Sequence, residues 1–346
     1  MNCVLAASAP ILGGVWRHVL DLAEALQRLN VEVLVLGPES VIPALRDRHS
    51  SLKFGALGSS SGEDIFHLHL ANTYEDHQGR LIRQAERRGS AVVVTEHLPR
   101  TLASDPSILS PRSPGANQWK KISKRVAMSR AHAMISISDE DRDFLIKRYN
   151  FPPERITAVP LEINVEGNPV ALTSRNRFVA AGSIITQKGF DVLVEASAFA
   201  TSNWTVEVFG EGPHRKRLED RANQLGGRVR FCGHSNNVLE EMDQSRGVII
   251  PSRWESGPYV LLEAMGRARP VIASRVDAMP RVVRQNDCGL LFEAGNSIEL
   301  ARALDQLTLS GDAERLGQNG YRAASRLSTV HMASNTLEVY HRVLAK

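Results

Sequence analysis

Residues 247–265 read GVII-PSRWESG-PYVLLEAM, and the rest of the chain is organised around this stretch. An apolar strand runs into the first proline and stops, and a polar loop with a carboxylate at Glu255 follows. Pro258 suits the first position of a helix, where its missing N–H costs little. We expect the N–H groups of residues 259–261 to lack partners within the helix, which makes a helix start of this kind an anion site, most often for phosphate.

Glu263 lies just over one turn further along the same predicted helix, near enough to meet a ribose. A strand, an acidic loop and a helix start are what a site needs to hold a nucleoside diphosphate and to place one acid near the attached group. The plainer alternative is a buried strand and an amphipathic helix that carries two surface glutamates.

The spacing of the two glutamates resembles a known signature. Glu255, seven residues and then Glu263, followed by Ala264-Met265 and by residues 270–274 (PVIAS), is similar to the donor site of retaining glycosyltransferases of the GT-B fold, family four. The resemblance implies an α/β chain with two Rossmann-like domains that face each other across a cleft. It implies an acceptor-binding domain over 1–165, a nucleotide-sugar-binding domain over 166–325, and a helix over 326–346 that packs back on the first domain.

Composition sets limits on the function. A chain of 346 residues is long for a single hydrophobic core and long enough for two domains. A content of 42% hydrophobic residues is typical of globular proteins. The net charge of +4 comes from nearly balanced signs and is too mild to imply nucleic acid. The three cysteines show no metal-like spacing, and neither a signal peptide nor an apolar run of membrane-span length is visible. We therefore expect a cytoplasmic protein with no nucleic-acid partner.

The first half opens with a strand, a turn that holds Gly13 and Gly14, a helix and a second strand, over residues 3–36. A glycine pair by itself is weak evidence, since tight turns use glycine everywhere. By resemblance, this pair, followed by Arg17-His18-Val19, matches the family's N-terminal loop, which lies against the donor and the acceptor.

Three histidines lie within or directly after predicted strands. His67 and His69 point to one face of a strand over 65–70, but no third metal ligand is evident nearby, so we interpret both as structural or cleft-lining. His97 follows a buried strand at its carboxyl end, the edge where ligands bind in open α/β sheets. The resemblance places an acceptor-side histidine there; the alternative is a loop histidine with ordinary partners.

Basic residues gather over 117–130, which reads as a helix with one cationic face. A solvated surface and a contact with anionic lipid or an anionic acceptor are both open for this helix. The candidate contact residues are Trp119, Lys120, Lys121, Lys124 and Arg125. A membrane contact would place this cytoplasmic protein at the inner face of the membrane.

The acids of residues 139–143 include an Asp-x-Asp, which another glycosyltransferase fold uses to hold a metal. Here they follow a strand and open a helix. Ser138 or Asp139 can cap that helix, and acids in its first turn complement its dipole. We therefore predict a structural role for these acids and no metal site.

The second half restarts with a strand over 178–181 and a turn over 182–189. The family pattern at this turn is Gly-Arg, a few residues, then Lys-Gly, and its two cations grip the diphosphate. Lys188-Gly189 matches, whereas Ser183 stands where the arginine is expected. The loss of one fixed charge puts donor affinity or donor identity in question.

By resemblance, the site divides into catalytic and donor-binding residues. The catalytic pair is His97 and Glu255. The donor-binding set is Gly13, Gly14, Ser183, Lys188, Gly210, Gly233, His234, Glu255, Ser256, Gly257, Pro258, Tyr259, Val260 and Glu263.

The implied reaction is retaining, metal-independent transfer of a sugar from a nucleotide-diphosphate sugar to a hydroxyl, in polysaccharide, glycolipid or glycoconjugate synthesis. No cofactor is expected; the co-substrate is a UDP or GDP sugar, and the acceptor is a carbohydrate or a lipid-linked molecule. The alternatives are a sugar-nucleotide epimerase or phosphorylase of the same fold and a non-catalytic partner protein. Ser183, Arg281 and Ala268, which replace usual family residues, favour the last of these.

Overall fold

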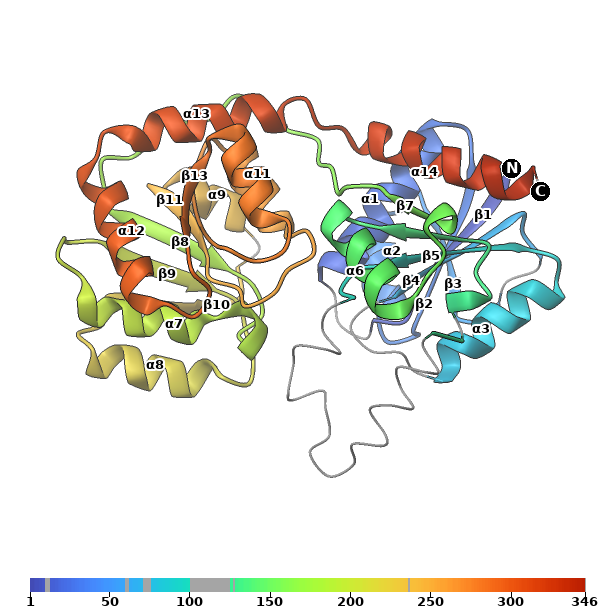
Figure 1. Ribbon diagram of the computed structural model, residues 1–346, viewed down its shortest axis with the longest axis horizontal. Helices are drawn as coiled ribbons and strands as arrows, with labels where there is room; N and C mark the ends of the chain where they lie inside the picture. The colour runs from blue at the N-terminus through green and yellow to red at the C-terminus, as the bar shows by residue number, and fades with distance from the viewer. Residues whose placement is uncertain are drawn as a thin grey trace. The chain divides into compact units, whose positions relative to one another are not determined.

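The computed structural model describes residues 1–9, 13–59, 62–70, 76–99, 125–126, 128–235 and 237–345, without the side chains of 76 and 77. The chain forms two compact units, Met1–Glu162 with Thr329–Lys346 and Ile163–Ser328. We expected divisions after residues 165 and 325; the units divide after Glu162 and Ser328. Each unit is built on one parallel sheet (Figure 1).

The first unit contains a parallel sheet in the order β3-β2-β1-β4-β5-β6-β7. Its strands are β1 Asn2–Ala7, β2 Glu32–Gly37, β3 Lys53–Ala56, β4 Ile65–Leu70, β5 Ala91–Glu96, β6 Ala133–Ser136 and β7 Ile156–Ala158. Its described helices are α1 Gly14–Arg28, α2 Ile42–Arg48, α3 Asp76–Arg87, α6 Asp139–Tyr149, the short η1 Pro153–Arg155 and α14 Thr329–Leu344.

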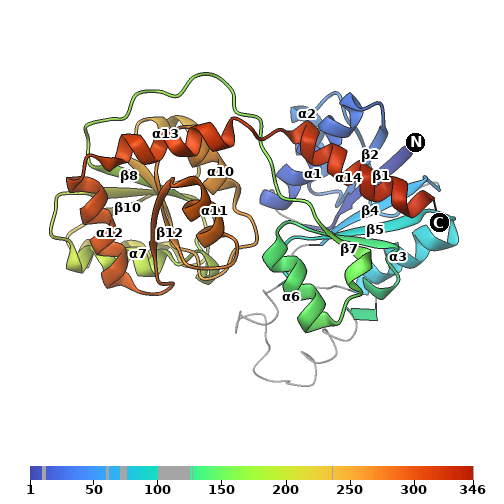
Figure 2. The same ribbon diagram turned by 45° about the horizontal axis from the view of Figure 1, so that its top comes forward.

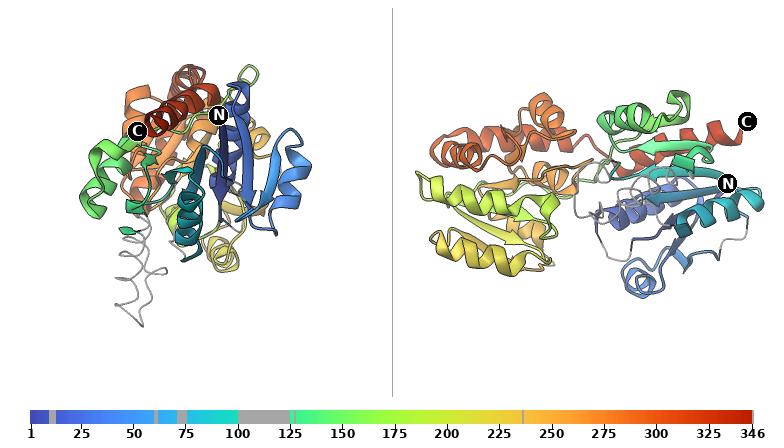
Figure 3. Two further views of the ribbon diagram at one scale, coloured as in Figure 1. Left: turned by 90° about the vertical axis from the view of Figure 1, so that its right-hand side faces the viewer. Right: turned by 60° about the horizontal axis from the view of Figure 1, so that its bottom comes forward.

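Helices cover both faces of the first sheet, which is why its central strands β4 and β5 are almost fully buried. On one face, Phe66 of β4 belongs to a buried cluster with Ile82 of α3 and Leu145 of α6. On the other face, α14 packs against α1, and Tyr340 of α14 reaches His67 of β4. Figures 2 and 3 show the red α14 beside the blue N-terminal segment.

The second unit contains a parallel sheet in the order β10-β9-β8-β11-β12-β13. Its strands are β8 Arg177–Ala181, β9 Thr205–Phe209, β10 Val229–Gly233, β11 Gly247–Ile250, β12 Val271–Ser274 and β13 Gly289–Phe292. Its described helices are η2 Thr186–Lys188, α7 Phe190–Ala196, η3 Ser197–Phe199, α8 Arg215–Gln224, α9 Val238–Asp243, α10 Tyr259–Gly266, α11 Met279–Asn286, α12 Ser297–Leu309 and α13 Asp312–Ala324.

Side chains of β8 alternate between two buried cores, as the pleat of a strand requires. Phe178 joins a cluster with α7, α8 and α12, for example with Leu193 and Leu304. Val179 joins the opposite cluster with α10 and α11, for example with Leu261. Figure 1 shows α7 and α8 below the strands and α13 above them. Each face of the second sheet is therefore sealed by helices.

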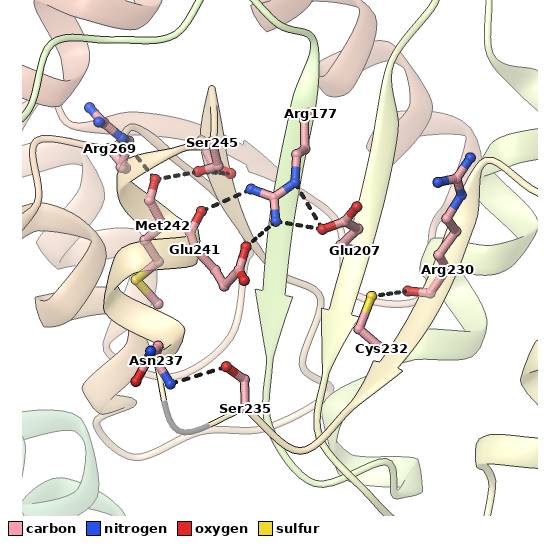
Figure 4. A network of polar contacts seen from close by, with 11 residues as sticks. Arg177, Glu207, Arg230, Cys232, Ser235, Asn237, Glu241, Met242, Ser245 and Arg269 are labelled. Carbon is pink, nitrogen blue, oxygen red and sulfur yellow. Dashed lines mark hydrogen bonds and ion pairs between the residues drawn. The ribbon is translucent and has the colours of Figure 1, made fainter.

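A network of arginines ties together the amino end of β8 (Figure 4). Arg177, the first residue of β8, donates from Nε to Glu207 Oε2 at 2.8 Å and from Nη1 to the Glu241 carbonyl at 3.0 Å. Ser245 and Arg269 both donate to the carbonyl of Met242 (2.8 and 2.9 Å). These side chains are therefore paired with other protein groups at the amino end of β8.

The structure confirms one local prediction and adds elements that the sequence analysis left unassigned. Ser138 caps α6, because its hydroxyl accepts from the Asp141 N–H at 3.1 Å, and the acids lie in the first turn. The short α2 and the half-buried edge strand β3 were not predicted, because neither carries a clear hydrophobic period. Among the described helices, none is both long and apolar enough to cross a bilayer.

Candidate functional site

The second sheet has a switch point between β8 and β11. These strands are neighbours, yet β8 connects onward to β9 on one side and β11 to β12 on the other. Open α/β sheets bind ligands outside the carboxyl ends of strands at such a point. The turn over 182–189 and the loop over 251–258 both leave the sheet there.

The turn and the loop are locked together by backbone contacts. Gly189 has φ +64°, and a Cβ at this position would lie 2.0 Å from the Pro251 carbonyl oxygen, so only glycine fits. The Arg253 N–H donates to the Gln187 carbonyl at 2.7 Å, and Gln187 Nε2 donates to the Trp254 carbonyl at 3.1 Å. These contacts fix the turn and the loop relative to each other.

Lys188 and Glu255 meet across this junction. The ammonium of Lys188 forms an ion pair with Glu255 Oε1, and Ser252 Oγ donates to the same oxygen at 2.9 Å. The Glu255 N–H donates to Asp277 Oδ2 at 2.6 Å. Glu255 is only 5% exposed, so this carboxylate needs its cation. The junction thus presents one fixed cation and one fixed acid at the switch point.

The start of α10 differs from the prediction in two ways. Pro258 is the N-cap, with φ −74° and ψ 122°, and the helix begins at Tyr259. The Leu261 N–H, predicted to lack a partner, donates to the Pro258 carbonyl at 3.0 Å, because the first turn tightens to an i→i+3 bond. Val260 is left as a first-turn amide with no backbone acceptor among the described residues.

Two glycines carry the neighbouring strand ends close to the turn after β8. Gly210 has φ +149°, and a Cβ there would lie 2.0 Å from the Gly182 carbonyl oxygen. Its N–H donates to the carbonyl of Gly233, the last residue of β10, at 2.8 Å. The structure thus brings Gly210 and Gly233 beside the turn that carries Lys188.

The remaining predicted donor residues of this unit lie along the same edge. Ser183 and His234 are exposed, Gly257 and Glu263 are half-buried, and Ser256 is buried.

The residues that hold the site in place were not predicted from the sequence. Arg253 donates to both carboxylate oxygens of Asp191 (2.8 and 2.6 Å) and to the Thr186 carbonyl at 2.9 Å. The bonds to Asp191 raise the pKa of Arg253. Burial alone would raise the pKa of Asp191, but the bonds from Arg253 lower it. Arg253 was inside the quoted stretch, yet nothing in the sequence pattern pointed to Asp191 as its partner.

In the first unit, His97 lies within a cluster of buried histidines. It follows β5, and its Nε2 lies 3.1 Å from His69 Nδ1 and 3.4 Å from His18 Nδ1. Burial lowers the pKa of His18 to about 4 and takes those of His69 and His97 well below 6.5, so all three rings are neutral at pH 7. No third potential ligand for His69 was evident from the sequence, but the fold brings His18 of α1 and His97, which follows β5, to it.

His67 serves the core instead. Its Nδ1 lies 2.6 Å from the Tyr340 hydroxyl and its Nε2 lies 2.6 Å from Thr95 Oγ1. Burial lowers the pKa of His67 to about 3, which keeps the ring neutral. With both ring nitrogens bonded to protein groups, His67 is a structural histidine that ties α14 to the sheet.

The other predicted residues of the first unit are placed as follows. Gly13 is the N-cap of α1 and Gly14 its first residue, and both are exposed. Arg125 is exposed. Trp119, Lys120, Lys121 and Lys124 lie outside the described residues.

Family models match both halves of the chain. Residues 12–166 match the model described as "Glycosyltransferase Family 4", and residues 167–323 match "Glycosyl transferases group 1". An alpha-D-kanosaminyltransferase of Streptomyces kanamyceticus is 26% identical over 252 residues, which is 67% of this chain and 65% of that protein. An alpha-maltose-1-phosphate synthase of Mycolicibacterium smegmatis is 27% identical over 97% of each chain.

Solved structures share the fold. Anabaena HepE, crystallised in complex with UDP, superposes with a TM-score of 0.81 over 98% of this chain and 99% of its own, at 16% identity. The two family models together span residues 12–323, and each covers most of one of the two parallel-sheet domains. The chain belongs to the group 1 glycosyltransferases and has the GT-B fold.

Proposed function

We propose that this protein transfers a sugar from a nucleotide-diphosphate sugar to a hydroxyl acceptor, with retention of the anomeric configuration. The observation that carries the proposal is the ion pair of Lys188 and Glu255 at the carboxyl ends of β8 and β11. A cation and an acid fixed side by side suit a ligand whose diphosphate adjoins a polyhydroxylated group.

The donor diphosphate is proposed to lie between Lys188 and the first turn of α10. The leaving phosphate gains negative charge as the glycosidic bond breaks, so a fixed ammonium and a helix start stabilise the transition state more than the ground state. Glu255 accepts hydrogen bonds from sugar hydroxyls, and Glu263, further along α10, meets the ribose. Because Lys188 supplies charge at the diphosphate, we propose that the step needs no divalent metal there.

The bond changes are those of a same-face substitution. The bond between the anomeric carbon and the leaving phosphate oxygen breaks, and a bond from that carbon to the acceptor oxygen forms on the same face. The acceptor's proton passes to the leaving phosphate, so no carboxylate needs to bond covalently to the sugar. His97, in the first unit, is the proposed residue on the acceptor side.

A thermal-shift panel with UDP, GDP, ADP and TDP and their sugar conjugates, run in EDTA, tests donor binding. UDP is the first candidate, because it is the nucleotide bound to HepE. Ligand at a hundred times its Kd adds about 2.7 kcal/mol, a shift of several degrees. A shift with one nucleotide names the donor class; no shift with any nucleotide would favour a non-catalytic partner protein.

Product analysis separates the remaining activities. NMR of the product with the shifted donor is expected to show the donor's anomeric configuration. Conversion without an acceptor would indicate an epimerase, and a requirement for free phosphate would indicate a phosphorylase.

We further propose a carbohydrate or lipid-linked acceptor and a place at the cytoplasmic membrane surface. The support is the cationic sequence around Lys120, Lys121 and Lys124. Co-sedimentation with anionic vesicles at low salt, lost on Lys→Ala substitution of all three, is the expected result. Failure to sediment with such vesicles would remove the membrane from the proposal.

A further inference from the structure

The histidine cluster of the first unit lies at that unit's own switch point. Strands β1 and β4 are neighbours whose onward connections go to opposite sides, and His69 of β4 pairs with Ala7, the last residue of β1. His18 comes from α1, the first helix after β1, and His97 directly follows β5. Three separate elements thus place one imidazole each at the carboxyl edge of the sheet, where an open α/β sheet binds ligands.

The spacing of the rings matches that of ligands around one small cation. Two nitrogens bound to zinc at about 2.0–2.1 Å in a tetrahedral site lie roughly 3.3–3.4 Å apart. The nitrogens here are 3.1 Å apart for His69 and His97 and 3.4 Å apart for His18 and His97. The ring centroids are separated by similar amounts, 4.9, 5.2 and 5.4 Å, as for three rings arranged around a common point. All three candidate ligand atoms lie within 4.8 Å of one another.

Hydrogen bonding among the rings accounts for only one of the two contacts at His97. The Nε2 of His97 offers either one lone pair or one N–H, yet it faces ring nitrogens of both His18 and His69. The Nε2 of His69 has no hydrogen-bond partner among the described residues, although it is buried. Burial without full pairing costs stability. A cation that accepts one lone pair from each neutral ring relieves the crowding at His97.

The chemistry of the cluster selects the class of ion. Neutral imidazole nitrogens suit zinc and the neighbouring transition metals, whereas magnesium and calcium prefer oxygen ligands. The described cluster of metal-ligating side chains contains three histidines and no carboxylate. Three protein ligands leave a fourth position for water or another small ligand. His67 is excluded as a further ligand, because Tyr340 and Thr95 occupy its nitrogens.

We propose that His18, His69 and His97 form a binding site for a divalent transition metal, with zinc as the expected ion. The site shares His97 with the proposed acceptor side, but its three ligands lie in the first unit, whereas the residues proposed to bind the donor diphosphate lie in the second. It therefore can be tested without any nucleotide or sugar.

The test is metal binding by the whole 346-residue chain after chelator treatment. Titration with Co²⁺ is expected to give the visible absorption of low-symmetry four-coordinate cobalt at one ion per chain, and Zn²⁺ is expected to abolish that absorption by displacement. His18→Ala is expected to weaken zinc binding about a hundredfold or more, since one of three ligands is lost.

His49→Ala is the matched control. His49 belongs to the same unit and pairs with a carboxylate, Glu24, at 2.8 Å, so it represents incidental surface binding and is expected to leave the cobalt spectrum unchanged. Folding of each variant is checked by circular dichroism, and the wild-type cobalt spectrum needs no variant at all. Absence of stoichiometric cobalt or zinc binding by the folded wild-type protein would overturn the proposal, as would zinc affinity that His18→Ala and His69→Gln both leave intact.

Discussion

Lys188 and Glu255 depend on each other in a way that shapes what their substitution does. Glu255 is almost fully buried, and Lys188 is its cation. A bound diphosphate would draw the ammonium toward itself, while Ser252 and the sugar hydroxyls remain to satisfy the carboxylate. Substitution of either residue therefore changes both the charge at the phosphate and the pairing of its neighbour.

Replacement of Lys188 by alanine is expected to lower kcat/KM for sugar transfer by one to a few powers of ten. The loss of one fixed charge that stabilises a leaving group costs roughly 2–4 kcal/mol. Steady-state kinetics with a saturating acceptor measures the effect. Lys216→Ala, at an exposed lysine near Asp220 in the same unit, is the control and should leave the rate unchanged. An undiminished rate in Lys188→Ala would show that another cation serves the diphosphate.

Glu255→Ala should separate turnover from nucleotide binding. We expect a strong fall in kcat, with the Kd of the nucleoside diphosphate nearly unaltered, because Glu255 is proposed to contact the sugar rather than the phosphates. Isothermal titration and kinetics on the same preparation give both numbers. Glu293→Ala, at an exposed glutamate of the same unit, controls for loss of surface charge. Parallel loss of binding and turnover in a folded variant would contradict the assigned role.

At the scale of elements, the carboxyl edge of the second sheet is assembled by close backbone approach. The turn after β8 contacts the loop after β11 at Gly189 and the turn after β9 at Gly210, each at a distance that leaves no room for a Cβ. The elements are therefore positioned by contacts between main-chain atoms, and these contacts determine where the side chains of the site lie.

Gly189→Ala is expected to destabilise the protein by more than about 2 kcal/mol, because the positive φ and the clash with Pro251 add together. Gly226→Ala is a matched comparison: φ there is +91°, but nothing lies within 4 Å of the added Cβ. We expect Gly226→Ala to cost only about 1 kcal/mol. Urea denaturation of both variants gives the difference, and equal costs would show that the close approach at Gly189 is unimportant.

Asp305 of α12 fastens the segment before β9. Its carboxylate accepts from the N–H and hydroxyl groups of Thr201 and Ser202 and from Trp204 Nε1, at 2.6 to 3.2 Å. Burial alone would raise the pKa of Asp305, but the bonds from Thr201 and Ser202 outweigh it and lower the pKa below 3.8. A carboxyl whose folded pKa lies below its unfolded value adds stability that is present above the unfolded pKa.

That stability should be lost as the pH falls from about 4 through the lower folded pKa of Asp305. Asp305→Ala is expected to cost about 2–4 kcal/mol at pH 7, since the buried Trp204 N–H and the donors of Thr201 and Ser202 lose their acceptor, and to remove this part of the acid dependence. Asp220→Ala, at an exposed acid near Lys216, should cost under about 0.5 kcal/mol. Denaturation between pH 3 and 7 provides the measurement; equal slopes for wild type and Asp305→Ala would refute the assignment.

At the scale of the whole molecule, the last helix completes a unit that the first half of the chain begins. The first unit joins Met1–Glu162 to Thr329–Lys346, and α14 packs against α1 within it. The stability of the first sheet thus depends on residues from the far end of the sequence. The bond between Tyr340 and His67 is a buried polar contact across this junction.

Tyr340→Phe is expected to destabilise the first unit by about 1–3 kcal/mol, because it leaves a buried imidazole nitrogen of His67 unpaired. Tyr321→Phe removes an equivalent hydroxyl in the second unit, one that donates to the Gly167 carbonyl at 3.3 Å in an exposed setting, and should be nearly neutral. Hydrogen exchange in β4 and α1 reports on the first unit. Unchanged exchange there in Tyr340→Phe would show that the hydroxyl contributes little to the docking of α14.

Much of the architecture could be read from local patterns. The alternation of strands and helices, the cap at Ser138, the Lys188-Gly189 turn and the loop with Glu255 were all predicted, and the structure has each of them. They were accessible because hydrophobic period, turn chemistry and capping act over a few consecutive residues. The roles of the site residues remain predictions, which the experiments above address.

Other features were decided only by the tertiary structure. The meeting of His18, His69 and His97, the pairing of Arg253 with Asp191 and the anchoring of Thr201 by Asp305 join residues 28 to 104 positions apart. Strand order and register determine which distant side chains meet, and no local pattern encodes either. The sequence alone therefore determined most of the elements, the glycosyltransferase signature and the individual candidate residues, whereas only the folded chain decided which of these residues lie together.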